Sequence, residues 1–272
     1  MAIFKALTFD GINSLDYGIY ITGEAVYNAP ERDVEMVTVP GKNGALAIDQ
    51  GRFENIEVTF PAGCFANNSY DFAQKIAAFR NALASRFSYK RLEDEYNPDE
   101  YRLALYRSGL EVKADGHHQA GEFKITFDCK PQRFLIDGDQ PYNFVSNYQE
   151  LLDENSVQLA NENGVDIEGG ITLSDNIENP TLFPSKPLIK ATGSGNIGIG
   201  DQLISIMDID NSTMIYIDCE SMEIYTSAGG IITGASSHVS FNGNDFPELP
   251  VGITGLTYTT ETIKIIPRWW RI

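Results

Sequence analysis

Four short segments of the chain carry residue types whose spacing could do chemistry. A glycine-rich run has the letters of a dinucleotide-binding loop, and an acidic run resembles the start of an EF-hand calcium loop. Two adjacent histidines could contribute to a metal site, and nearby acidic groups supply the paired carboxylates that glycoside hydrolysis uses. In that order, the segments are residues 193–198, residues 208–212, His117 with His118, and residues 93–95 with 99–100.

The glycine-rich and acidic motifs lack features that dinucleotide binding and calcium binding require. A dinucleotide loop binds pyrophosphate through the backbone amides of a following helix, whereas residues 197–201 alternate isoleucine and glycine and predict a glycine-rich β-turn instead. An EF-hand loop needs glycine at its sixth position and glutamate at its twelfth, and the chain has Thr213 and Cys219 there. We therefore expect an acidic hairpin turn at residues 208–212.

The histidines and the carboxylates also have simpler interpretations. Neighbours on an extended chain point to opposite faces, so His117 and His118 predict the solvated tip of a hairpin loop over residues 115–121. Acidic groups without surroundings that raise a pKa are typical of solvated loops. The sequence contains no nucleophile elbow, zinc-protease motif or phosphate-binding loop. We expect no catalytic site, no cofactor and no metal site.

The composition predicts a folded, acidic protein. The chain has 272 residues, 42% of them hydrophobic, and a formal net charge of −18 at pH 7. Binding to a nucleic-acid backbone or to an anionic membrane needs clustered lysine and arginine, so we expect neither. No apolar run is long enough for membrane insertion, and the first ten residues reach Asp10 too early for a secretory signal. The distant positions of Cys64, Cys129 and Cys219 predict buried free thiols.

The charge is distributed unevenly between two halves. Residues 1–133 have fifteen basic and nineteen acidic side chains, a net charge of −4, whereas residues 134–272 have five basic and nineteen acidic side chains, a net charge of −14. The cluster at residues 137–141 favours turns and suits a linker. We therefore predict two domains, residues 1–138 and residues 139–272.

Apolar periodicity predicts a sheet and one helix in the first half. Four apolar residues with helical spacing follow an N-cap at Asn68 or Ser69, and the helix should end near Ser85. Alternation of apolar and polar residues predicts strands at residues 55–60 and 122–127. The apolar residues of the helix are Phe72, Ile76, Phe79 and Leu83.

The second half predicts an antiparallel β-sandwich, because many short strands alternate with glycine, asparagine and proline. The last strand, residues 262–266, should place Ile263 and Ile265 inward, with the two tryptophans packed just beyond it. Residues 146–179 stay undecided between a short helix and strands. The other predicted strands are residues 187–191, 202–206, 214–218, 223–225 and 231–232.

A series of short motifs runs in order along nearly the whole chain. The most specific is residues 121–131, a glycine-led strand that ends in Cys129-Lys130-Pro131. The others are residues 9–11, 16–19, 39–46, the predicted helix with residues 101–106 after it, 179–180, 187–189, 193–195, 217–220 with Tyr225, 246–247 with Leu249, and 267–271. Together they resemble the distal tail protein family of siphophages, the phages with long, flexible, non-contractile tails. The chain departs from the family pattern at Lys42, where arginine is common, and in a long acidic stretch at residues 150–178.

The resemblance implies a mainly β, β-rich α+β fold and a structural role. The N-terminal domain would be a β-sandwich or split-barrel-like unit with one α-helix that forms a homohexamer ring. The C-terminal domain would be an antiparallel β-sandwich related in shape to galectins or carbohydrate-binding modules. Such a protein is a tail-tip hub in the virion, assembled in the cytoplasm of a host that is usually Gram-positive. Its partners would be the major tail tube protein, the tail-tip or tail-associated lysin protein, and receptor-binding proteins.

Two groups of residues are candidates for contacts. The turn formed by Pro40, Gly41, Lys42, Asn43 and Gly44 has good turn chemistry, and we expect it to make an assembly contact through Lys42. Five aromatic residues of the second half could instead bind a host surface glycan or simply pack: Tyr216, Tyr225, Tyr258, Trp269 and Trp270. A glycan-binding module is therefore the alternative function, and a tail-borne cell-wall hydrolase is a third.

Overall fold

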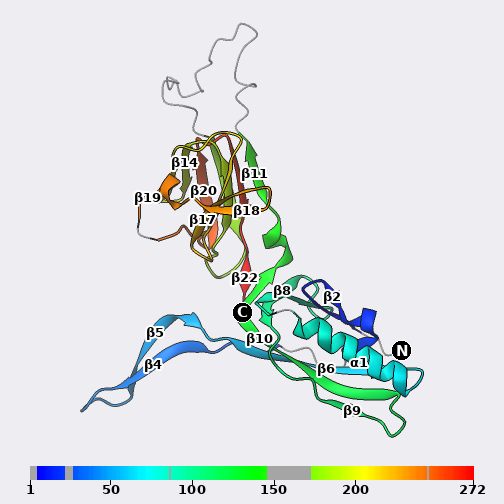
Figure 1. The fold of residues 1–272 in the computed structure, drawn as a ribbon. Helices are drawn as coiled ribbons and strands as arrows, with labels where there is room; N and C mark the ends of the chain where they lie inside the picture. The colour runs from blue at the N-terminus through cyan, green and yellow to red at the C-terminus, as the bar shows by residue number, and fades with distance from the viewer. Residues whose placement is uncertain (1–4, 22–26, 86, 146–172, 244) are drawn as a thin grey trace, which may run out of the picture. The chain divides into compact units, whose positions relative to one another are not determined.

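The structure is a computed structural model that describes residues 5–21, 27–85, 87–145, 173–243 and 245–272. The chain forms two compact units, residues 1–136 with Ile272 and residues 137–271, called unit 1 and unit 2 below. Both are built mainly from antiparallel strands (Figure 1). The mainly β fold class expected from the sequence is therefore confirmed.

Unit 1 is organised around one antiparallel sheet that curves toward a barrel. Its strands follow the order β2-β1-β7-β8-β10-β6-β3, and β9 pairs with the start of β10. An isolated bridge joins Lys5 to Ile21, so the segment before β1 reaches the far edge of the sheet. The strands are β1 Leu7–Phe9, β2 Ile12–Asn13, β3 Ile19–Ile21, β6 Ile56–Phe65, β7 Lys90–Asp94, β8 Glu100–Leu105, β9 Val112–Ala114 and β10 Ala120–Leu135.

The single long helix of the described residues, α1, spans Ser69–Ala84 and confirms the helix predicted from the sequence. The side chain of Asn68 caps it by accepting a hydrogen bond from the Asp71 N–H at 2.9 Å. The short 3-10 helix η1, Ser14–Tyr17, lies beside α1, where the Tyr17 and Phe79 rings are 5.7 Å apart. The predicted apolar stripe faces the sheet: Phe72, Phe79 and Leu83 are buried and Ile76 is partly buried.

Aromatic side chains fill the core of unit 1. Phe127 is fully buried, and its ring centroid lies 5.1 Å from that of Phe9 and 5.7 Å from that of Tyr106. Alternation along β6 and β10 points every second side chain into this core. The core fixes the curvature of the sheet and holds α1 against it.

A separate two-stranded hairpin projects from this sheet (Figure 1). Its strands are β4, Arg32–Thr38, and β5, Ala45–Phe53, and they pair only with each other. No residue of either strand is buried. The sequence analysis did not foresee this arm, although it did predict the turn at its tip.

Unit 2 is a sandwich of two antiparallel sheets, as the strand pattern predicted. The six-stranded sheet has the order β11-β21-β13-β16-β17-β18, and the five-stranded sheet has the order β12-β20-β14-β15-β19. The first contains β11 Tyr142–Val145, β13 Leu188–Thr192, β16 Met214–Asp218, β17 Glu223–Ala228, β18 Ile231–Gly234 and β21 Thr262–Ile266. The second contains β12 Leu173–Asn179, β14 Gly195–Ile199, β15 Gln202–Ile206, β19 Val239–Phe241 and β20 Gly252–Tyr258, and a short 3-10 helix η5, Ser236–His238, precedes β19.

The end of the chain confirms one expectation and corrects another. Ile263 and Ile265 of β21 have no exposed surface, so the two isoleucines do face inward. However, β21 is not the last strand, because a two-residue strand β22, Trp270–Arg271, follows it. Part of the undecided segment forms β12, and residues 146–172 lie outside the described residues.

The cluster at residues 137–141, which favours turns and suits a linker, overlaps an ordered turn. Residues Ile136–Asp139 form a 3-10 helix, η2, and Gly138 is buried. A Cβ atom on Gly138 would collide with the backbone nitrogen of Trp269, and the Gly138 carbonyl accepts a hydrogen bond from the Arg268 N–H at 2.8 Å. The turn therefore packs closely against the end of the chain, which a local sequence pattern cannot reveal.

Candidate functional site

The acidic motif is a turn, as the sequence analysis predicted, whereas the glycine-rich motif is a turn only at residues 193–194 and is otherwise part of a strand. The glycine run leads into strand β14 at Gly195, with no helix where a dinucleotide loop would need one. In the acidic run, the Asp210 carboxylate accepts hydrogen bonds from the N–H and hydroxyl groups of Ser212 and Thr213. These bonds, led by those from Ser212, hold the pKa of Asp210 below its ordinary value. The carboxylate therefore serves the turn itself.

The carboxylates of residues 93–95 are engaged in local structure. Glu93 pairs with Arg91, and Asp94 accepts from the backbone N–H groups of residues 96 and 97. Glu95 accepts from the Ala6 N–H at 3.1 Å. Among the described residues, no group of three histidine, cysteine or acidic side chains could hold a metal ion. Within the same ranges, none of the helices has the length and apolar character that a bilayer crossing requires.

One carboxylate expected to be solvated is buried. Glu100 is only 6% exposed, and its Oε2 atom accepts a hydrogen bond from Arg133 at 3.4 Å. The interpretation of residues 99–100 as a solvated acidic pair was therefore wrong for Glu100. It fails because Glu100 begins β8, where alternation places Glu100, Arg102 and Ala104 on the inward face.

Arg102 is a buried cation that sequence reasoning missed. It lies directly opposite Arg133 in the β8–β10 register, and both terminal nitrogens are buried without a hydrogen-bond partner in the described part of the chain. Burial, reinforced by the charge of Arg133, lowers the pKa of Arg102 to about 10. Burying this charge therefore lowers the stability of unit 1.

The candidate assembly turn forms the tip of the β4–β5 hairpin. All five of its residues are exposed, and the Lys42 N–H donates to the Val39 carbonyl at 3.1 Å. Gly41 and Gly44 have φ angles of 81° and 80°, a left-handed conformation that favours glycine. Lys42 has no ion-pair partner among the residues that the structure describes. The ammonium group at this tip is therefore available for an external contact.

The hairpin behind this tip is apolar on both faces. Residues paired across antiparallel strands share a face, so Met36 lies with Ala47 on one face and Val37 lies with Leu46 on the other. Met36 is 63% exposed and Leu46 is 49% exposed. At the base, exposed ion pairs join Arg32 to Asp49 and Arg52 to Asp33. The hairpin therefore has an ion-paired base and exposes apolar side chains on both of its faces.

Tyr216 and Tyr225 of the candidate glycan surface form a half-buried stack. The rings of Tyr216 and Tyr225 are 5.0 Å apart and nearly parallel, on the outer face of the six-stranded sheet. The Lys190 ammonium lies 5.5 Å from the Tyr216 ring centroid. On the other side of the pair, Tyr225 lies opposite Gly234 of the edge strand β18. Tyr258 does not join this surface, because it is buried against the ring of Phe144.

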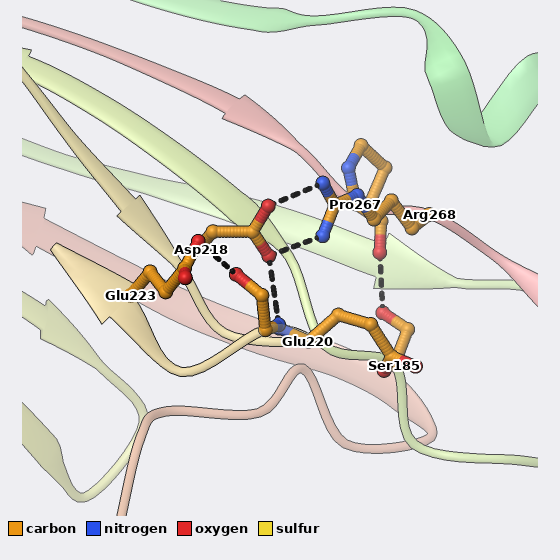
Figure 2. Close-up of polar contacts among 7 residues, drawn as sticks. Ser185, Asp218, Glu220, Glu223, Pro267 and Arg268 are labelled. Atoms are coloured by element: carbon orange, nitrogen blue, oxygen red, sulfur yellow. Dashed lines mark hydrogen bonds and ion pairs between the residues drawn. The ribbon is translucent and has the colours of Figure 1, made fainter. Parts of the chain in front are cut away.

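The tryptophans belong to a C-terminal clamp, the segment Pro267–Arg271 bound along unit 2. Figure 2 shows its central contact, in which Arg268 donates two parallel hydrogen bonds to the Asp218 carboxylate at 2.7 and 2.9 Å. The Ser185 hydroxyl donates to the Pro267 carbonyl at 2.6 Å. Burial would raise the pKa of Asp218, but the hydrogen bonds and charge of Arg268 outweigh it, so the pKa lies below its ordinary value.

Each tryptophan packs within this clamp. Trp269 is 3% exposed and lies over Gly138, and Trp270 stacks on Phe183 with ring centroids 4.4 Å apart. The Trp270 Nε1–H donates to the Pro184 carbonyl at 2.9 Å. The two rings are thus used for packing rather than presented as an open platform.

Comparison with known proteins identifies the relatives of this architecture. Residues 13–129 match the family of the phage tail protein RIFT-related domain. No curated protein sequence matches the chain significantly. The family match lies within unit 1 and includes the β4–β5 hairpin, α1 and most of the curved sheet.

Solved phage structures share the fold of the whole chain. The Dit protein of phage SPP1, described as a paradigm of the hub adsorption apparatus in phages that infect Gram-positive bacteria, has a TM-score of 0.66 at 12% identity and covers 99% of this chain and 100% of its own. A chain of the activated phage P2 baseplate with calcium has a TM-score of 0.54 at 10% identity, and the match covers 97% of this chain and 98% of that chain. A chain of the corresponding structure with strontium has a TM-score of 0.55 at 11% identity, and the match covers 99% of this chain and 98% of that chain. The resemblance to siphophage tail proteins is therefore confirmed by family model and fold.

Proposed function

We propose that this protein is a structural hub of a phage tail, placed at the distal end of the tail tube. The observation that carries the proposal is the match of residues 13–129 to a phage tail domain. The fold of the SPP1 hub protein over the whole chain supports it. In this role the protein transmits contacts between tail components and performs no catalysis.

The hub is a ring of six copies joined through the N-terminal domain, residues 1–138. Unit 1 carries the low net charge of −4 counted over residues 1–133, so its copies can pack side by side with little repulsion. The domain from residue 139 onward carries most of the negative charge and lies outside the ring. A ring satisfies the contacts of every copy because head-to-tail interfaces close on themselves.

The partners of this ring follow from its position. One face meets the major tail tube protein and the other meets the tail-tip or tail-associated lysin protein, while receptor-binding proteins attach at the side. The protein resides in the virion and assembles in the host cytoplasm. The turn at residues 40–44 contributes an inter-copy or ring-face contact through Lys42.

Electron microscopy of the purified full chain tests the ring directly. Class averages should show particles with six-fold symmetry and a central opening. Particles that stay single at every concentration, and that remain single with tail tube protein added, would contradict the proposal. A zymogram on host cell walls is the matching test of the non-enzymatic role, where clearing would support a wall hydrolase instead.

A second function, binding of a host surface glycan, has one observation in its favour. Tyr225 pairs across the sheet with Gly234 of the edge strand β18, and nothing lies within 4 Å of where a Gly234 Cβ would be, so no side chain of that strand stands beside the Tyr225 ring at this position. An open aromatic face of this kind can stack on a sugar ring. Titration with host glycans should then show binding that Tyr225→Ala removes, whereas Tyr258→Ala would act only through stability.

A further inference from the structure

One continuous row of residues crosses the outer face of the six-stranded sheet of unit 2. Residues paired directly across antiparallel strands share a face, and each member of the row is paired with the next. The flanking isoleucines, such as Ile189 and Ile217, point the other way and are fully buried. From β11 to β18, this lysine–tyrosine row consists of Asn143, Lys264, Lys190, Tyr216, Tyr225 and Gly234.

The two lysines of the row repel each other and have no acidic partner. Lys190 and Lys264 lie directly opposite each other, and like charges in that position destabilise a sheet. Neither lysine forms an ion pair with any residue that the structure describes. Residues 134–272 contain only five basic side chains against nineteen acidic ones, yet the sheet brings two of the five together. Because Lys264 is exposed and Lys190 is partly exposed, both ammonium groups can meet an anionic ligand.

The tyrosines continue the row beside the lysines. The Tyr216 and Tyr225 rings are stacked with centroids 5.0 Å apart, and the Lys190 ammonium lies 5.5 Å from the Tyr216 centroid. Gly234 ends the row without a side chain, and nothing lies within 4 Å of where its Cβ would be. Aromatic rings pack against the apolar faces of sugar rings, whereas ammonium groups bind phosphate or carboxylate. The row therefore combines the two contacts that a charged sugar polymer needs.

The length and surroundings of the row suit an extended ligand. Neighbouring strands are about 4.8 Å apart, so the distance across the sheet from β11 to β18 is about 24 Å. On one side, the next positions of this face hold Asp218, which is bound to Arg268, and the exposed Glu223. On the other side, Thr192 and Thr262 share a hydrogen bond between their hydroxyl groups and carry no charge. A polymer that crosses the strands along the row meets both lysines and both tyrosines.

We propose that the lysine–tyrosine row binds an anionic glycan, a sugar polymer that carries phosphate or carboxylate groups. Lys190 and Lys264 bind the charged groups, and the stacked tyrosines contact the sugar rings. This proposal rests on the glycan-binding function considered above and names the chemical class of its ligand. A neutral glycan would leave the two opposed lysines without a role.

Titration of the full chain with defined polymers tests the site. Polygalacturonate supplies carboxylates and a ribitol phosphate teichoic acid supplies phosphates, while dextran is the neutral polysaccharide and polyglutamate is the polyanion without sugar. Calorimetry should show binding of at least one charged polysaccharide that weakens as the salt concentration rises. Dextran and polyglutamate should bind at least about tenfold more weakly.

Variants of the row assign the binding to its residues. The double variant Lys190→Gln with Lys264→Gln should weaken binding of the charged polysaccharide by about tenfold or more and reduce its dependence on salt. Tyr225→Ala should weaken binding to a similar extent, and thermal melts show whether each variant is folded. The matched control, Lys186→Gln, removes an exposed lysine of unit 2 outside the row and should bind like the wild type.

The possible failures are distinguishable. Absence of binding to every polysaccharide would overturn the glycan-binding function and this proposal together. Dextran binding that the lysine variant leaves unchanged would overturn the anionic class alone, and equal losses from Lys186→Gln and the lysine double variant would overturn the row as the site. Equal binding of polyglutamate would show attraction of any polyanion, including an acidic protein, and would contradict the role of the sugar. Six-fold particles in any of these cases would leave the hub proposal intact.

Discussion

At the scale of single residues, unit 1 buries a guanidinium whose terminal nitrogens have no hydrogen-bond partner among the described residues. The guanidinium of Arg102 is buried opposite Arg133, and Glu100 is bound to Arg133. A buried charge without a partner is costly, and apolar replacement of such groups is often stabilising. Arg102 is therefore a position where the chain gives up stability.

Replacing this residue should stabilise the protein. We expect Arg102→Met to raise the free energy of unfolding by about 1–4 kcal/mol, because methionine fills similar space without a charge. Denaturant titration of the full chain measures the change. Arg133→Met is the matched comparison and should destabilise, because it removes a hydrogen-bond donor from the buried carboxylate of Glu100. A loss of stability in Arg102→Met would show that the guanidinium has a stabilising partner.

The Asp218–Arg268 pair should make stability depend on pH. The pKa of Asp218 lies below its ordinary value, so the unfolded carboxyl takes up a proton before the folded one as the pH falls. Its stabilisation is fully present above the unfolded pKa of about 3.9 and disappears as pH falls through the lower folded pKa. We expect Asp218→Asn to lose about 1.5–3 kcal/mol at pH 7 and progressively less below pH 4.

Thermal melts of wild type and Asp218→Asn across this pH range measure the effect. Glu178→Gln, at an exposed position of β12, serves as the control. A constant difference between Asp218→Asn and wild type from pH 7 to pH 2 would contradict the linkage.

At the scale of elements, the sequence predicted those helices and strands that depend on residues close together in the chain. Helix α1 follows from its N-cap and its apolar spacing, and most strands of unit 2 follow from alternation between turns. The linker at residues 137–141 could not be read in the same way, because its order depends on Trp269 far along the chain. The burial of Glu100 and Arg102 was not predicted, because charged residues at inward positions of a strand give the same sequence pattern as a solvated loop. The β4–β5 arm was missed because its strands pair only with each other and bury no side chain, so no inward and outward face distinguishes them in the sequence.

The C-terminal clamp should be an energetic element of unit 2. Trp269→Ala removes a nearly fully buried ring and should lower the free energy of unfolding by about 3–5 kcal/mol, and deletion of residues 267–272 should lower the melting temperature of the intact protein further. Calorimetry of the full chain measures both changes. Unchanged melting, together with lost binding to a host glycan, would instead identify the tryptophans as ligand platforms.

At the scale of the whole molecule, the charge of the chain is concentrated in its second half. Residues 134–272 have a net charge of −14 in each copy, so six copies repel unless they are held apart or meet cationic partners. The few cations of the chain therefore matter for assembly, and Lys42 lies exposed at the hairpin tip.

Reversing the charge at that tip should weaken assembly. We expect Lys42→Glu to lower the fraction of assembled protein most strongly at low salt, because screening at high salt weakens the contact that it removes. Analytical ultracentrifugation at several salt concentrations measures this fraction, with Lys113→Glu, on the exposed surface of β9, as the control. Equal assembly of Lys42→Glu and wild type at every salt concentration would leave residues 40–44 as a hairpin turn without a contact role.

The central claim is that copies of this chain close into a six-membered hub. Native mass spectrometry of the full chain over a series of protein concentrations tests it most directly. The account predicts a species of six times the 30.1 kDa chain mass, or twice that number for paired rings, with few open intermediates. A single species of 30.1 kDa at every concentration, unchanged by added tail tube protein, would contradict the account.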